Sequence, residues 1–193
     1  WGIQKLAKEV GVEQSDILTT YVCSSCGSFG VHNFQGQELK CPFCKSEKSY
    51  NTTGVQTGVS EDQLNQVYNL MDVYCHPFTS GGQEIPIQEA KLTEKITLVT
   101  NYSCGEDNCV PESASIPLDW SSYREHGTEF IKASTDPKSI AKGLELVYNM
   151  SPQEKVEMGK KARQWVNDKF SIDVIGKKLE DFIDSRELFD KDK

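Results

Sequence analysis

Apolar residues recur at helical spacing along much of the chain and alternate with short runs typical of buried strands. One predicted helix places Leu64, Val67 and Met71 on one face, after a capping box over 60–63. The run 96–100 is rich in β-branched residues, as in a strand covered on both faces. The spacing predicts helices over 3–10, 60–71 and 86–92, and strands over 17–20, 73–76 and 96–100.

The second half of the chain is predicted to be mostly helical. Residues 101–128 show no regular spacing and are expected to be irregular, with a short strand over 130–133. The capping residues Asp136, Ser151 and Ser171 then precede three helices. Strands that alternate with helices indicate an α/β fold of Rossmann type, with a mostly parallel sheet and helices on both faces. Such sheets bind ligands in loops beyond the carboxyl ends of their strands.

Four cysteines lie in a segment of different composition, rich in Ser, Gly, Asn and Lys. Cys23 and Cys26 form one C-x-x-C pair, Cys41 and Cys44 form the other, and 14 residues separate the pairs. This spacing is typical of four thiolates around one structural Zn²⁺ ion. Free buried cysteines and a redox dithiol are the alternatives. A thioredoxin-type dithiol begins a helix after a strand, and neither pair is so placed.

The predicted domain organisation is a zinc-ribbon insertion, 21–53, in an α/β domain formed by 1–20 and 54–193. The first residue, Trp1, leads at once into a helical pattern with no strand before it. We therefore expect the α/β domain to be truncated at its start. With 193 residues, 37% of them hydrophobic, the chain suits one ordinary domain and a small second module.

Charge and hydropathy narrow the class of protein. The net charge of −8 disfavours nucleic acid as a partner, and the ribbon adds only three lysines against two glutamates. No run of 18 apolar residues occurs, and the first ten residues lack the pattern of a signal peptide. We expect no membrane span and a cytoplasmic location. Seven cysteines without a secretion signal favour free or metal-bound thiols over disulfides.

A glycine-rich loop, 79–84, follows the predicted strand 73–76 and leads into the helix that begins near Pro86. Backbone N–H groups and the positive end of a helix favour an anion in such a loop. Many glycine loops only turn the chain, so spacing alone leaves both interpretations open. His76, at the end of the strand, likewise fits either a group near a ligand or a hydrogen-bonded structural group.

These segments together carry a family resemblance, which covers Trp1 to about Ser185 apart from the ribbon. Residues 58–77, the loop to Glu89–Ala90 and the strand 96–100 resemble the C-terminal domain of family-four retaining glycosyltransferases of the GT-B fold. The resemblance implies an enzyme in which this domain binds a nucleotide-sugar donor. A missing N-terminal domain of the same chain would bind most of the acceptor. The implied reaction is sugar transfer with retention, and these 193 residues alone are expected to be inactive.

The signature of that family is two glutamates separated by seven residues. Glu89 matches the second, which in the family holds the ribose hydroxyls of the donor, and the place of the first falls on Gly81. Family backbone contacts to the sugar and the diphosphate carry over to the residues that follow position 81. The expected donor-binding residues are Gly81, Gly82, Gln83, Glu84, Ile85 and Glu89.

The missing glutamate at position 81 has two interpretations. In the first, Glu84 supplies the sugar-facing carboxylate and is the catalytic residue of this chain, because the glycines at 81 and 82 let the loop reposition. In the second, the chain is a noncatalytic module, in which the ribbon docks a partner on a degenerate glycosyltransferase-like scaffold. Cys104 and Cys109 bracket two acidic residues, but two thiols make a weak metal site and a surface loop is expected there.

Overall fold

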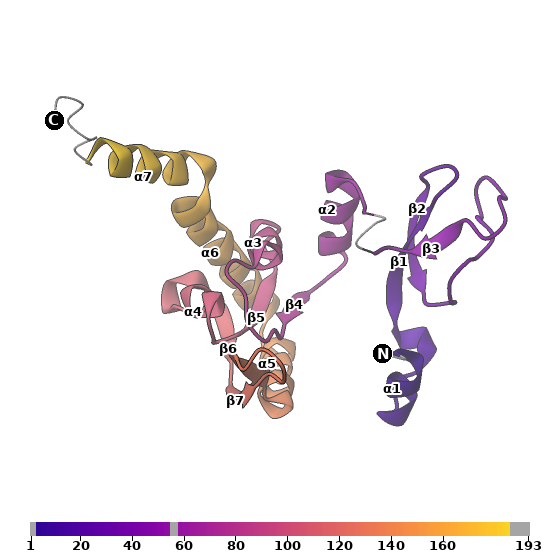
Figure 1. The fold of residues 1–193 in the computed structure, drawn as a ribbon, viewed down its shortest axis with the longest axis horizontal. Coiled ribbons are helices and arrows are strands. Elements are labelled where there is room, and N and C mark those ends of the chain that lie inside the picture. Colours follow the sequence, from indigo (N-terminus) through magenta and orange to yellow (C-terminus); the bar gives the residue numbers. More distant parts are fainter. Residues whose placement is uncertain (1–2, 55–57, 186–193) are drawn as a thin grey trace. The chain divides into compact units, whose positions relative to one another are not determined.

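The computed structural model describes residues 3–54 and 58–185 of the chain. The chain divides into two compact units, Trp1–Val67 and Tyr68–Lys193 (Figure 1). The first unit holds an antiparallel sheet in the segment with the four paired cysteines, which we call the cysteine-bearing sheet. The second unit holds a parallel sheet and most of the helices.

The first unit is built on a three-stranded antiparallel sheet. Helix α1 (Ile3–Glu9) and a 3-10 turn, η1 (Gln14–Asp16), precede the strands. The strands are β1 (Leu18–Cys23), β2 (Phe29–Asn33) and β3 (Tyr50–Thr52), and β1 lies in the centre. The last helix to begin in this unit is α2 (Glu61–Asn69), where the Ser60 hydroxyl accepts the Gln63 N–H as the capping box predicts.

The strand predicted over 17–20 differs from the prediction in extent and in partner. It begins at Leu18, continues to Cys23 and pairs antiparallel with β2 and β3, whereas the sequence pattern predicts it in the α/β domain. The reason is that its alternate residues Tyr21 and Cys23 are both buried in the cysteine-bearing sheet. Its first residue, Leu18, is 62% exposed and contributes no core.

Aromatic rings supply the core that aliphatic residues do not supply in this unit. Tyr21 and Tyr50 are buried, and their rings stack 5.1 Å apart. The His32 ring stacks on Tyr21 at 4.4 Å. The Tyr21 hydroxyl donates to the Gly36 carbonyl at 2.9 Å and accepts the Gln35 N–H at 2.9 Å, so its polar end is satisfied inside the fold.

The second unit contains the predicted parallel sheet. Its strands are β4 (Val73–His76), β5 (Ile96–Thr100) and β6 (Ser115–Leu118), in that order across the sheet. All five residues of β5 are buried, and successive residues of a strand point to opposite faces, so both faces of this central strand are covered. Helix α3 (Ile85–Leu92) joins β4 to β5 and packs on β5. The prediction of an α/β fold with a parallel sheet is therefore confirmed.

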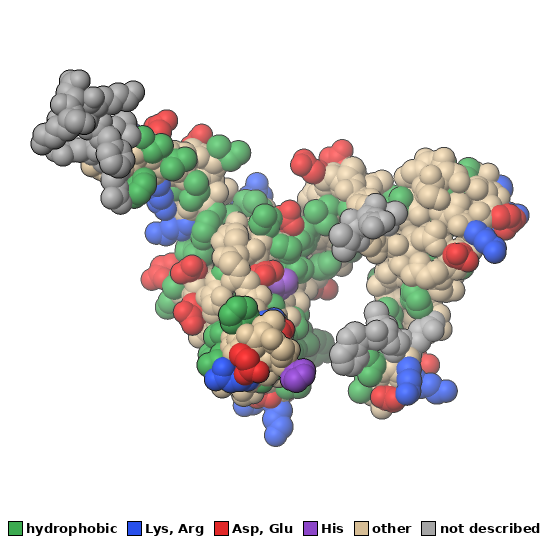
Figure 2. Space-filling model, viewed as in Figure 1, with side chains coloured by type: hydrophobic (Ala, Val, Ile, Leu, Met, Phe, Trp, Pro, Cys, Tyr) green, Lys and Arg blue, Asp and Glu red, His purple; other side chains and the backbone are tan. Residues whose placement is uncertain are grey.

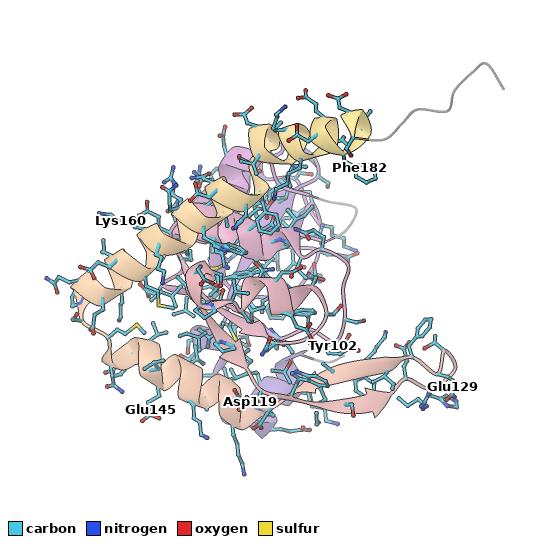
Figure 3. All side chains as sticks on the ribbon, turned by 90° about the vertical axis from the view of Figure 1, so that its left-hand side faces the viewer. Tyr102, Asp119, Glu129, Glu145, Lys160 and Phe182 are labelled. Atoms are coloured by element: carbon cyan, nitrogen blue, oxygen red, sulfur yellow. The ribbon has the colours of Figure 1, made fainter. Side chains whose placement is uncertain are left out.

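The stretch predicted as irregular is regular in the structure. Residues 101–128 contain α4 (Cys104–Asn108), the 3-10 turn η2 (Pro111–Ser113), the third parallel strand β6, and β7 (Trp120–Arg124). The predicted strand at 130–133 is β8 (Ile131–Thr135), which forms an antiparallel hairpin with β7 that projects towards Glu129 in Figure 3. These elements escaped prediction because β6 has four residues including Pro117, and every residue of β7 is exposed.

The three C-terminal helices begin at their predicted caps. They are α5 (Pro137–Asn149), α6 (Pro152–Phe170) and α7 (Ile172–Asp184), and the side chains of Asp136, Ser151 and Ser171 accept backbone N–H groups at their starts. Helix α5 packs on the sheet, and its Gly143 lies against Leu98. Apolar side chains stay exposed along α7 (Figure 2). Among the described residues, no helix combines the length and apolar character needed to cross a membrane.

Candidate functional site

The four paired cysteines converge at one end of the cysteine-bearing sheet. Their Sγ atoms all lie within 4.8 Å of one another, with 3.7 Å between Cys23 and Cys44 and 3.8 Å between Cys26 and Cys41. Four sulfurs placed tetrahedrally at about 2.3 Å from a zinc ion are roughly 3.8 Å apart. The cluster can therefore hold a metal ion such as zinc, as the spacing predicts.

The two C-x-x-C turns share one backbone pattern. In each turn, the first cysteine's carbonyl accepts the N–H four residues on, and its own N–H donates to the carbonyl five residues on. Gly27 and Lys45 hold the equivalent fourth position, with φ of 69° and 64°. The Ser25 N–H also donates to the Cys23 sulfur at 3.3 Å. Tight turns of this kind aim both sulfurs of a pair at one point.

The groups around the cluster give its thiols different pKa values. A hydrogen bond from the Ser49 hydroxyl outweighs desolvation and lowers the pKa of the Cys23 thiol to about 6. For Cys44, a backbone bond from Ser46 lowers the pKa, but desolvation and three neighbouring sulfurs together raise it to about 12. Adjacent sulfurs repel each other's charge, so a cation is needed for all four to ionise together.

The second candidate site lies beyond the carboxyl ends of β4 and β5, where α/β sheets bind ligands. The loop after β4 contacts the loop after β5, because the Ser103 hydroxyl donates to the Gly81 carbonyl at 2.8 Å and the Phe78 N–H donates to the Thr100 hydroxyl at 3.1 Å. Gly82, Gln83 and Ile85 are exposed there, whereas Gly81 and Glu84 are half-buried.

Glu84 folds back over the glycine loop. Its Oε2 lies 3.0 Å from the Nε2 atom of His76, and both side chains are about one fifth exposed, at 23% and 19%. A Cβ atom added to Gly81 would lie 2.2 Å from Oε1 of Glu84. The Glu84 carboxylate thus occupies the space that a side chain at position 81 would need.

Glu89 lies within α3, five residues after Glu84, and its carboxylate is held by Tyr68 of α2. Its Oε2 accepts the Tyr68 hydroxyl at 2.9 Å. Burial, and next the bond to Glu89, raises the pKa of Tyr68, which keeps this hydroxyl a donor. Burial also raises the pKa of Tyr74, with the charges of Glu84 and Glu89 adding to the effect.

Sequence reasoning missed Tyr68, Tyr74 and Ser103 as members of this site. The period-two spacing of Tyr74, His76 and Phe78 was the available signal, since alternate strand residues share a face. The Ser103 contact depends on the packing of two loops and has no local signal. Residues 77–89 contain two glutamates and no Lys or Arg, so an anion here would depend on backbone N–H groups and the start of α3.

The other two cysteines considered as metal ligands lie outside the four-cysteine cluster. Cys104 and Cys109 are half-buried free thiols on α4 and just after it, and the metal-capable cluster among the described residues is the four-cysteine one.

Comparisons with protein-family models, with curated proteins and with solved structures find no match for this chain.

Proposed function

We propose that the second unit binds the nucleotide-sugar donor of a retaining glycosyltransferase. The observation that carries this proposal is the Glu84 carboxylate held over Gly81, the position at which the resembled family has its first glutamate. Glu89 follows at the position of the second. Two carboxylates held by hydrogen bonds, one just before α3 and one within it, suit hydroxyl-rich ligands, because carboxylates accept strong hydrogen bonds from hydroxyls.

Each group has a defined task in this proposal. Glu89, oriented by Tyr68, accepts hydrogen bonds from the ribose, and Glu84 accepts them from the transferred sugar. The backbone of the exposed residues Gly82, Gln83 and Ile85 and the start of α3 face the diphosphate, whose charge grows as the sugar leaves. The acceptor is proposed to bind mainly to another domain, so this chain binds donor without turning it over.

We propose further that the four-cysteine cluster holds Zn²⁺. Four thiolates leave the ion no open position, so the zinc would organise the fold of the first unit and perform no catalysis. The support is the sulfur geometry and the scarcity of aliphatic core around it.

The test is calorimetric titration of the 193-residue chain with UDP-glucose, GDP-mannose and ADP-glucose. We expect weak binding of at least one donor. Glu89→Gln should lower its affinity about tenfold, because a charged acceptor contributes roughly 1.5–3 kcal/mol. Glu145→Gln, at an exposed position on α5, is the matched control and should change nothing.

The rival function is a noncatalytic binding module. The lack of Lys and Arg in 77–89 favours it, since no cation in this segment draws a diphosphate. It predicts that a folded, zinc-loaded chain binds none of the three donors, and that result would overturn the donor proposal.

A further inference from the structure

We propose, on the basis of the donor-binding function above, that His76 is a positioning residue that orients the Glu84 carboxylate towards the donor's sugar. His76 ends β4, and its Nε2 bond of 3.0 Å reaches the residue just before α3. A carboxylate accepts only, so hydrogen sits on Nε2. Nδ1 then faces the Tyr74 hydroxyl at 3.1 Å, and a chain of hydrogen bonds runs from Tyr74 through His76 to Glu84.

Neighbouring rings fix the plane of the His76 imidazole. It stacks on Tyr74 at 5.5 Å with an interplanar angle of 19°, and it packs against Phe78 at 5.4 Å. Tyr74 is in turn held edge-on by Tyr68 at 5.7 Å. A ring bonded at both nitrogens and packed on both sides has one orientation, so it also restricts the glutamate bonded to it.

This restriction matters for binding because a free glutamate side chain loses up to about 2 kcal/mol of rotamer entropy when it is ordered. In this chain Glu84 is already ordered by folding, so a ligand meets a prepared acceptor. His76 engages Oε2, and Oε1 lies over Gly81. A sugar hydroxyl that reaches Gly81 can donate to Oε1, whereas a bare nucleoside diphosphate has no such hydroxyl beyond its phosphates. His76 therefore sets the preference for nucleotide sugar over bare nucleotide.

The experiment compares the affinity of each variant for a nucleotide sugar and for the matching bare diphosphate, with UDP-glucose and UDP, GDP-mannose and GDP, and ADP-glucose and ADP as the probes. We expect His76→Leu to lower the affinity for the bound nucleotide sugar about five- to tenfold and that for its diphosphate less than twofold. His76→Gln keeps a donor group and should restore most of the loss. Equal losses for both ligands, or no loss, would overturn the proposal. Thermal melting of both variants shows whether each is folded. If His76→Leu is unfolded, the comparison of His76→Gln with His76→Asn decides instead.

A second measurement needs no donor and separates this proposal from the function on which it rests. Two-bond ¹H–¹⁵N spectra of the unliganded chain show which imidazole nitrogen carries hydrogen. We expect hydrogen fixed on Nε2 of His76 in the wild type and released in Glu84→Leu, with Glu89→Leu as the matched control. Failure of every donor to bind refutes the donor function. A His76 ring that exchanges freely between tautomers in the wild type refutes the positioning role whether or not a donor binds.

Discussion

Replacement of Lys91 by methionine removes a buried amine whose protonation is coupled to the folding of the second unit. Lys91 lies on α3 with 0% exposure, and its Nζ lies 4.2 Å from the centroid of the Trp165 ring. Its hydrogen bonds reach the backbone and side-chain oxygens of Asn108 at 3.4 and 3.5 Å. Burial lowers the pKa of the amine from 10.5 to about 7.

The pKa in the folded state lies below the ordinary value that the unfolded chain keeps, so unfolding takes up a proton between about pH 7 and 10.5. The free energy of unfolding therefore rises with pH in this window, and it falls as the pH drops towards 7 and the buried amine takes on charge. One proton gives a slope of about 1.4 kcal/mol per pH unit. Between pH 7.5 and 9.5 the wild type should gain roughly 2–3 kcal/mol relative to Lys91→Met.

Urea unfolding of both proteins at pH 7.5, 8.5 and 9.5 measures this difference in slope. The sign at any single pH also depends on the lost bonds to Asn108, but the slope does not. Burial raises the pKa of the Cys109 thiol to about 11, so that thiol stays neutral over this range. Lys142→Met, on the exposed side of α5, controls for the loss of one positive charge. Parallel pH profiles for wild type and Lys91→Met would refute the reasoning.

Three further predictions concern the metal cluster and two glycines. Metal analysis should find one zinc per chain, and Cys41→Ser should unfold the first unit while the melting of the second is retained; a zinc-free folded protein with four titratable thiols would contradict this. Gly81→Ala should lower donor affinity about tenfold, because its Cβ meets a carboxylate oxygen at 2.2 Å, whereas Gly176→Ala on α7 has open space and should not. Gly159→Ala on α6 should destabilise the second unit by more than about 1 kcal/mol in urea unfolding, because its Cβ would lie 2.3 Å from a backbone carbonyl oxygen. Gly176→Ala on α7 is the control and should be neutral or stabilising by about 0.5–1 kcal/mol.

The elements that sequence could predict are those with a strong local signal. The helix starts at Ser60, Asp136, Ser151 and Ser171 follow from capping chemistry between neighbours in sequence. The cysteine cluster follows from two tight turns of fixed spacing. The central strand 96–100 follows from burial on both faces, which leaves an unbroken apolar pattern.

The parts that could not be predicted depend on contacts between distant residues. The hairpin of β7 and β8 is exposed along β7, so no alternation of apolar and polar residues marks it. The partner of β1 is chosen by the buried rings of Tyr21 and Tyr50, which are 29 positions apart in the sequence. In the candidate donor site, the bond from Tyr68 to Glu89 spans 21 residues and joins the end of α2 to α3. Local spacing carries no information on such a pair.

We propose that the loop after β4 and the start of α3 bind a nucleotide-sugar donor. An amide NMR titration of the ¹⁵N-labelled chain with the nucleotide sugar that binds best tests it most directly. We expect shift changes to concentrate in residues 79–85, in the first turn of α3 and at Ser103, which contacts the Gly81 carbonyl. Saturating donor that leaves these amides unchanged, or that shifts only residues of the cysteine-bearing sheet or of α7, would contradict it.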